Sequence, residues 1–335
     1  YKGGMKAVVW TELLQASVYI LGGLSAIVLL GRSVPGGWGS ILDVASAGNK
    51  MRVIDTYMGF DRPYTLFAGL IGGAFLSMAS HGTDQLIVQR LLASRSLKDA
   101  QRAIIGSGLV VFAQFTLFLM VGIGLFAFYH GRTFATSDQI FPTFILEQMP
   151  PGLVGLILAA ILAATMSTHS GAINSLAAAT THDIYIPLFK KRPDDAATLR
   201  FGKLSALAWG VVLTGGALLY KEQGTPVVVI ALSIASFTYG ALLGGFFLGW
   251  LWRRAIQRDA ILGMSVALVV MSVVVFAKQL IPIFPGMTSP LTTLSKIAFP
   301  WYVLIGTSIT LIVGILSSLT HPQLTEAEEA GRTWR

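Results

Sequence analysis

The chain has 335 residues, and its 24 Lys and Arg outnumber its 16 Asp and Glu, giving a formal net charge of +8. Apolar residues make up 54% of the chain and charged residues only 12%, and the mean hydropathy is +0.69. Because soluble domains carry about 25% charged residues, this composition excludes an ordinary soluble domain and indicates an all-α polytopic membrane protein. The chain contains no cysteine, which excludes disulfides, thiolate metal ligands and cysteine nucleophiles within it.

Eight segments are long and apolar enough to cross a bilayer, for which about 20 residues are needed. In chain order they are 8–30, 63–92, 100–129, 152–188, 197–220, 227–252, 260–280 and 301–319. A short amphipathic helix is expected at the surface at 138–149, between the third and fourth segments. The remaining loops are too short for a soluble domain, so we expect a single transmembrane domain over residues 1–335.

The basic residues indicate how these segments are oriented. If the N-terminal end is cytoplasmic, sixteen of the 24 basic residues fall on the inside, as the positive-inside rule requires. They are Lys2, Lys6, Arg90, Arg95, Lys98, Arg102, Lys190, Lys191, Arg192, Arg200, Lys203, Arg253, Arg254, Arg258, Arg332 and Arg335. We therefore expect an integral protein of a bacterial inner (plasma) membrane with both ends of this chain in the cytoplasm, and no nucleic-acid partner. The chain opens on Tyr1 without Met or a signal peptide, so we expect an N-terminal part to precede it.

The second segment has polar residues at its centre. A continuous helix over 63–92 would run about 45 Å, against a hydrocarbon core of about 30 Å. Its middle reads SMASHGTDQ, which includes Gly82 and Asp84. An intramembrane Asp is costly in lipid unless the backbone breaks there and faces a cavity, as in the broken helices of secondary transporters. The alternative is that Asp84 reaches the cytoplasmic interface and pairs with Arg90.

The fourth segment contains the run AATMSTHSGAINSLAAATTHDIY at 163–185. Helical spacing puts two sets of polar side chains on neighbouring faces: Ser167, Ser170 and Asn174 on one, Thr168 and Ser175 on the other. Neutral oxygens at membrane depth suit a weakly bound monovalent cation. The alternative is that small and hydroxyl residues only allow neighbouring helices to pack closely.

Two further features of the sequence have simple interpretations. Glu12 lies one turn inside the cytoplasmic end of the first segment, where it either reaches the interface or takes part in an ion-linked site. The pairs Gly240/Gly244 and Gly245/Gly249 have small-xxx-small spacing and predict close helix packing.

Three stretches together resemble the sodium/solute symporter family: GGMKAVVWTELLQ, GTDQLIVQRLLASRSLKDAQRA and AATMSTHSGAINSLAAATTHDIY. The resemblance implies ten core helices in two five-helix repeats of inverted topology, of which about eight transmembrane helices, including appended ones, would be present here. Residues 1–31 would be the last helix of the first repeat, 62–253 the second repeat, 259–320 appended helices and 321–335 a cytoplasmic tail. The first four core helices would lie outside this sequence.

The resemblance also implies ion ligands. The principal sodium site would use the backbone carbonyl of Ala164 and the hydroxyls of Ser167 and Thr168, together with carbonyls of a helix outside this sequence. A possible second ion site would use Glu12 and Ser170. At that second site Glu stands where the family usually has Asp, and the residue after Ser170 is glycine where a serine is expected.

By the same resemblance, the substrate would bind beside the break in the second segment, at Ser77, Ser80 and His81. Sugar-carrying relatives place Asn and Tyr at the positions of the two serines, and Lys where this chain has Val111, so a hexose of the type that those relatives carry is not expected. The sixth segment could add polar contacts from Ser236, Thr238 and Tyr239.

These residues predict a secondary transporter that couples inward sodium movement to uptake of a small organic solute by alternating access. The solute would be a sugar, sialic acid or a carboxylate-like molecule, and Na+ the coupling ion. We expect no catalytic residue and no metal other than sodium. The expected partners are the solute and the lipid bilayer, with no obligatory protein partner. The alternatives are a proton-coupled symporter, a symporter-like sensor module, and a membrane hydrolase using His81, Asp84, His169 or Asp183. The hydrolase lacks the motifs HExxH and GxSxG.

Overall fold

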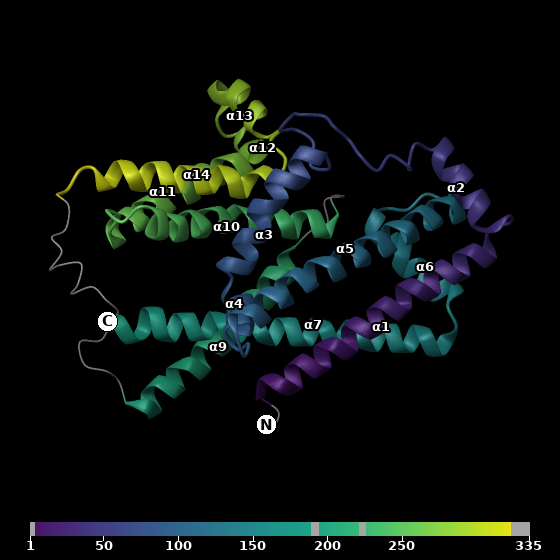
Figure 1. The fold of residues 1–335 in the computed structure, drawn as a ribbon, viewed down its shortest axis with the longest axis horizontal. Coiled ribbons are helices and arrows are strands. Elements are labelled where there is room, and N and C mark those ends of the chain that lie inside the picture. The colour runs from purple at the N-terminus through teal and green to yellow at the C-terminus, as the bar shows by residue number, and fades with distance from the viewer. Residues whose placement is uncertain (1–3, 189–193, 221–225, 323–335) are drawn as a thin grey trace. The chain divides into compact units, whose positions relative to one another are not determined.

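The computed structural model describes residues 4–188, 194–220 and 226–322, and all the regular structure in these ranges is helical (Figure 1). This confirms the predicted all-α membrane fold. The chain forms two compact units. The first contains Tyr1–Met51 and Ile105–Thr225, and the second contains Arg52–Ile104 and Pro226–Arg335.

The helices of the first unit are, in chain order, α1 (Gly4–Ser33), α2 (Gly37–Ala47), most of α5 (Leu97–Phe128), α6 (Ile140–Gln148), α7 (Pro151–Ala179), α8 (Ile186–Leu188) and α9 (Asp195–Leu219). A 3-10 turn at Ser137–Gln139 precedes α6, and a π-helical segment at Thr180–Tyr185 joins α7 to α8. α7, this segment and α8 therefore form one helix, Pro151–Leu188, of 38 residues. The predicted fourth segment at 152–188 is confirmed as a single helix.

The second unit begins with a π-helical segment at Ala68–Gly72, then α3 (Gly73–Gly82) and α4 (Gln85–Leu92). Its later helices are α10 (Val227–Leu251), α11 (Gln257–Val275), α12 (Ala277–Leu280), α13 (Thr288–Leu294) and α14 (Pro300–Ser318). Within the described ranges, seven helices are long and apolar enough to cross a membrane. They match every predicted segment except the second, which is broken as predicted, because α3 ends at Gly82 and α4 begins at Gln85.

The core of the first unit is built on two short helices beside the long ones. Phe144 and Ile145 of α6 are buried with residues of α1, α5 and α7. A short amphipathic helix is thus present within 138–149, with one face in the core and Leu146, Glu147 and Gln148 exposed. The helix α2 is not among the predicted segments, because its 11 residues are too few for a span, but its Ile41 and Ala45 form a buried stripe.

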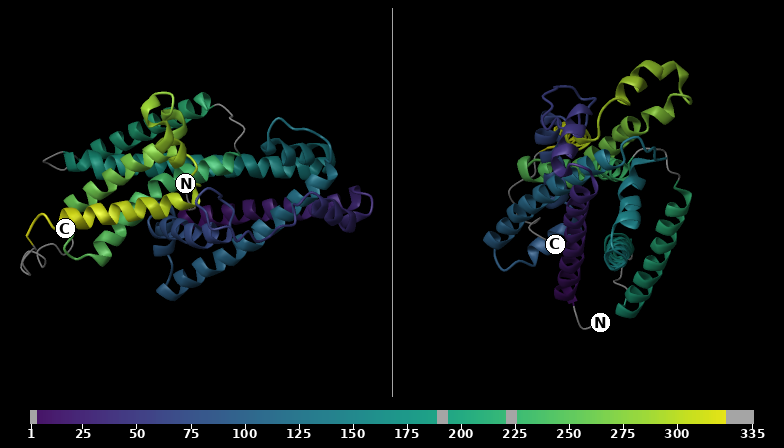
Figure 2. Two further views of the ribbon diagram at one scale, coloured as in Figure 1. Left: turned by 90° about the horizontal axis from the view of Figure 1, so that it is seen from above. Right: turned by 90° about the vertical axis from the view of Figure 1, so that its right-hand side faces the viewer.

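Three helices of the second unit, α10, α11 and α14, pack closely, and they lie side by side in Figure 1 and Figure 2. A Cβ built on Gly240 would come within 2.9 Å of the Gly306 Cα, and one built on Gly244 within 2.5 Å of the Thr310 Cβ. These contacts put α10 and α14 in parallel and show that the pair Gly240/Gly244 serves close packing. In the second pair, Gly245 contacts Met264 of α11, whereas a Cβ on Gly249 would meet nothing within 4 Å.

Candidate ion and solute sites

A cavity in the first unit brings together residues from both predicted ion sites. Its volume is about 450 Å³, and α1, α5, α6 and α7 form its walls. Glu12 of α1 and Ala164 of α7 both line it, and Gln15, Tyr19 and Gln114 add polar atoms. The structure therefore places the predicted acid at the same cavity as the predicted carbonyl ligand.

The hydroxyls of α7 fall into two groups. Thr165 Oγ1 donates to the carbonyl of Ile161 at 2.8 Å, and Ser170 Oγ donates to the carbonyl of Ser167 at 3.0 Å. In the described part of the chain, the hydroxyls of Ser167 and Thr168 make no such bond. Both oxygens carry lone pairs that could bind a cation, and no described residue donates a hydrogen bond to them. The residues that line the cavity of Glu12 and Ala164 do not include Ser167, Thr168 or Ser170.

The predicted solute residues form one linked polar group on α3. Ser80 Oγ lies 2.9 Å from His81 Nδ1, and both atoms contact the carbonyl of Ser77, at 3.2 and 3.1 Å. These bonds occupy one nitrogen of His81. Among the described residues, nothing bonds to His81 Nε2 or to the Ser77 hydroxyl, and Ser77 is exposed. This group can therefore hydrogen-bond a small polar molecule through two open positions.

The three polar residues of α10 differ in what they offer. Ser236 is fully buried, and its hydroxyl finds no partner among the described residues. Thr238 Oγ1 donates to the carbonyl of Ala235 at 3.2 Å. Tyr239 donates its hydroxyl to Asp84 Oδ2 at 2.7 Å, a partner that the sequence analysis did not name. Only Ser236 of these three has a buried hydroxyl open to a ligand.

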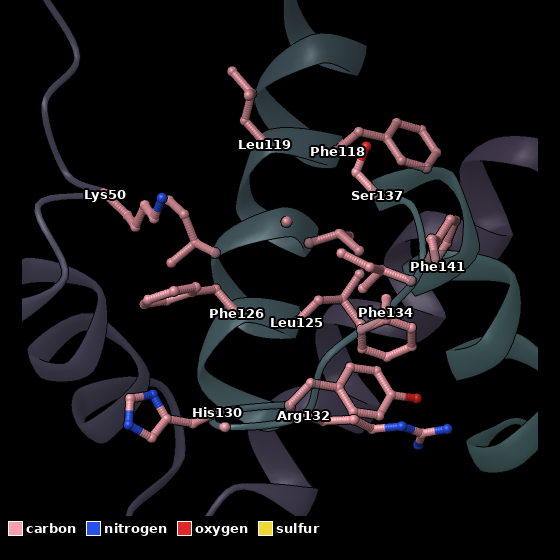
Figure 3. Close-up of a pocket in the computed structure, with 16 residues that line it drawn as sticks. Lys50, Phe118, Leu119, Leu125, Phe126, His130, Arg132, Phe134, Ser137 and Phe141 are labelled. Atoms are coloured by element: carbon pink, nitrogen blue, oxygen red, sulfur yellow. The ribbon is translucent and has the colours of Figure 1, made fainter. Parts of the chain in front are cut away.

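A second cavity of the first unit, about 790 Å³, is lined by none of the predicted site residues (Figure 3). Its walls are aromatic, and Lys50 lies 5.3 Å above the ring of Phe126 at its edge. At the opposite edge Arg132 makes a bidentate pair with Glu147, both bonds 3.0 Å long. This Arg132 bond lowers the pKa of the Glu147 carboxyl, and burial together with the Glu147 bond raises the pKa of Tyr129 to about 12.

The residues of the alternative hydrolase interpretation are divided between the units. His81 and Asp84 lie in the second unit, and His169 and Asp183 lie in the first. Within the described ranges, no three His, Cys, Asp or Glu side chains are grouped so that they could hold a metal ion.

The chain has hydroxyl-bearing residues along α7 and a helix that is broken between α3 and α4. The sequence profile of the sodium:solute symporter family matches residues 1–267. The chain belongs to this family. The resemblance noted in the three stretches of sequence is thereby confirmed.

Several members of the sodium:solute symporter family are similar to this chain. The sodium-dependent multivitamin transporter of Oryctolagus cuniculus is 32% identical over 279 residues, covering 80% of this chain and 43% of that protein. The sodium-coupled monocarboxylate transporter 1 of Homo sapiens and the sodium/sialic acid symporter NanT of Aliivibrio fischeri are each 27% identical, cover 95% of this chain, and are themselves covered to 60% and 61%.

A solved structure supports the fold as well. It is a Na+-coupled sialic acid symporter in a substrate-bound outward-open state, and it matches with a TM-score of 0.74 at 25% identity. The match covers 97% of this chain and 64% of the solved chain. The chain thus spans between 43% and 61% of the length of the curated relatives named here.

Proposed function

We propose that the protein is a secondary active transporter that couples inward sodium movement to the uptake of a small organic solute by alternating access. The observation that carries this proposal is the pair of open hydroxyls on α7, Ser167 and Thr168, in a chain of the sodium:solute symporter family. Neutral oxygens bind sodium weakly enough for it to be released inside. The membrane potential adds about 2.3 kcal/mol per charge per 100 mV to the driving force.

The proposed sodium ligands in this chain are the carbonyl of Ala164 and the hydroxyls of Ser167 and Thr168, which lie within two turns of α7. Glu12, at the cavity that Ala164 also lines, is the proposed acid of a second ion site. Ser170 is the second proposed ligand there; its hydroxyl donates to the carbonyl of Ser167, which leaves the oxygen's lone pairs for an ion.

The proposed solute site is the linked group Ser77, Ser80 and His81. Two of the relatives are named for sialic acid and for monocarboxylates, both of which carry a carboxylate. A carboxylate can accept from the Ser77 hydroxyl and from His81 Nε2 when that nitrogen is protonated, so we propose a carboxylate-bearing solute. No catalytic residue is part of this proposal.

The layout of the domain follows the same proposal. Residues 1–31 end a first repeat, 62–253 form the second, 259–320 are appended and 321–335 form a cytoplasmic tail. The protein lies in a bacterial inner membrane with both ends of this chain in the cytoplasm. The positive-inside bias of the sequence supports this orientation.

The test is thermal unfolding of the full-length gene product in detergent, in sodium and in potassium at equal ionic strength. Sodium at one hundred times its dissociation constant stabilises by about 2.7 kcal/mol, which appears as a raised unfolding temperature. Ser167→Ala and Thr168→Ala are expected to abolish this rise. Thr165→Ala is the matched control, since its hydroxyl is already bonded within the helix, and it keeps the rise. A wild-type protein with no sodium-specific rise would leave proton coupling through Glu12 or a sensor as the better function.

A further inference from the structure

Two adjacent residues form the break in the second segment: one ends α3 and the other starts α4. Thr83 ends α3, because both its amide, at 2.9 Å, and its hydroxyl, at 2.7 Å, donate to the carbonyl of Ala79. Asp84 starts α4, because its carbonyl accepts from the amide of Val88 at 2.9 Å and its Oδ1 accepts from the amide of Ile87 at 3.4 Å. The break is therefore a defined joint, with a helix ending on one residue and the next helix capped by the following one.

The second carboxylate oxygen of Asp84 leaves the joint and binds another helix. Oδ2 accepts the hydroxyl of Tyr239 on α10 at 2.7 Å, and the two residues are 155 positions apart in sequence. The Tyr239 ring is itself fixed, since it packs with Phe75 and Leu76 of α3 against the buried Ala79, Leu243 and Val303. A rigid ring therefore holds a carboxylate that is also the cap of α4.

α4 depends on this attachment more than α3 does. Its eight residues, Gln85–Leu92, include no side chain that is fully buried among those described, and Leu92 at its end is 79% exposed. α3, in contrast, buries Ala79 against α10 and α14. A short helix with little buried surface keeps its direction only if a specific bond fixes it, and hydrogen bonds to charged groups are the strong ones.

We propose that Tyr239 is a positioning residue for the transport cycle: its bond to Asp84 holds α4 in the arrangement seen here and sets how readily the broken helix changes arrangement. This inference rests on the proposed function, because alternating access requires two arrangements of the protein, and sodium binding is proposed to favour one of them over the other. Tyr239 acts through Asp84 and is not proposed to touch the solute or the ion.

The experiment reports the position of α4 without any knowledge of the solute. Leu92→Cys is introduced into the full-length gene product, any cysteine outside this chain is replaced by serine, and an environment-sensitive maleimide fluorophore is attached. The chain itself supplies no competing cysteine. Fluorescence is titrated with sodium against a potassium background in detergent, first in the otherwise wild-type protein and then with Tyr239→Phe.

Tyr239→Phe keeps the ring and removes one hydrogen bond to a charged group. The sodium concentration at the midpoint of the fluorescence titration is therefore expected to shift by about tenfold. Tyr302→Phe is the matched control in the same unit: it also loses one hydroxyl, bonded to the carbonyl of Ile297 at 3.2 Å, and its midpoint stays at the wild-type value. Asp84→Asn, which can still cap α4 and bond to Tyr239, stays within about threefold of wild type.

Asp84→Ala removes the same bond from the other side and gives a second, independent test if Tyr239→Phe does not fold. The double variant Tyr239→Phe/Asp84→Ala is expected to shift no further than Asp84→Ala alone, because Asp84→Ala, which also removes the cap of α4, already removes the bond that Tyr239→Phe breaks. A wild-type midpoint in Tyr239→Phe, or additive shifts in the double variant, would overturn this inference alone. No sodium response in the wild-type protein, by fluorescence or by unfolding temperature, would overturn the proposed function and this inference with it.

Discussion

At the scale of single residues, Asp259 is a fully buried carboxylate with three hydrogen-bond donors around it. It accepts from the amide of Ile256 at 2.9 Å, from Ser317 Oγ at 2.6 Å, and from His321 Nε2 at 3.0 Å. Arg254 donates to the carbonyls of Ser318 and His321 from the same side. The Asp259 carboxylate thus joins the start of α11 to the end of α14, and its contact with His321 is an ion pair when His321 is protonated.

This cluster makes a contribution to the free energy of unfolding that is lost as the pH rises. The bond to Asp259, and secondarily the bond to the Pro322 carbonyl, raise the pKa of His321 above its ordinary value of about 6.5. A group with a raised pKa in the folded state stabilises fully below its unfolded pKa, so this contribution is present below about pH 6.5 and is lost as the pH rises through the higher folded value.

We therefore expect the unfolding temperature of the wild-type protein to contain a component that falls as the pH rises above about 6.5. His321→Gln, which keeps a neutral donor, is expected to lack this component. Unfolding temperatures measured from pH 5.5 to 9 for both proteins check it. Parallel curves for the two proteins would show that His321 does not carry the effect.

At the scale of helices, α10, α11 and α14 meet through glycines because lipid gives little driving force for helix association beyond close packing. A Cβ on Gly263 of α11 would come within 2.6 Å of the Thr310 carbonyl, and one on Gly240 of α10 within 3.0 Å of the Val303 carbonyl. These obstacles are backbone atoms, which cannot turn away as a flexible side chain can.

Two alanine substitutions on α10 should accordingly have opposite effects. Gly240→Ala pushes α14 away and is expected to destabilise by about 1–3 kcal/mol, the cost of overpacking. Gly249→Ala, in open space on the same helix, is expected to be neutral or to stabilise by up to about 1 kcal/mol through helix propensity. Unfolding temperatures in detergent measure both, and equal effects at the two positions would contradict the packing shown here.

At the scale of the whole molecule, the distribution of Lys and Arg predicts which loops face the cytoplasm. The two ends of α5 are predicted to lie on opposite sides of the membrane. Arg95 and Lys98 lie at its start, on the predicted cytoplasmic side, and Arg132 lies in the connection after it, on the predicted outside. Within the second unit, the parallel packing of α10 and α14 agrees with this alternation, because two further crossings by α11 and α14 return the chain to the same direction.

We expect Thr133→Cys to react with a membrane-impermeant maleimide in intact cells, and Ala93→Cys to react only after permeabilisation. Both side chains are exposed, so access depends on the side of the membrane and not on burial. Labelling in cells that express a background without other cysteines checks this, and the reverse pattern would invert the proposed orientation.

The sequence by itself determined the membrane class, the approximate positions of the spans, a helix break within the stretch SMASHGTDQ, and the family. Each depends on a local signal: long apolar runs, a carboxylate two residues after a glycine within one of them, and three separate sequence motifs. Spacing placed Ser167 and Thr168 on two neighbouring polar faces, and the family resemblance implied that they are sodium ligands. In the structure they differ from Thr165 and Ser170, whose hydroxyls donate to helix carbonyls.

Only the tertiary structure decided which polar residues meet. The partners Tyr239 and Asp84 are 155 residues apart, and His321 and Asp259 are 62 apart. It also decided that α2 and α6 bury one face in the core of the first unit. The physical reason is that apolar side chains serve a membrane helix equally well against lipid and against another helix. The hydrophobic pattern therefore shows where a helix spans, but it does not show which neighbour it faces.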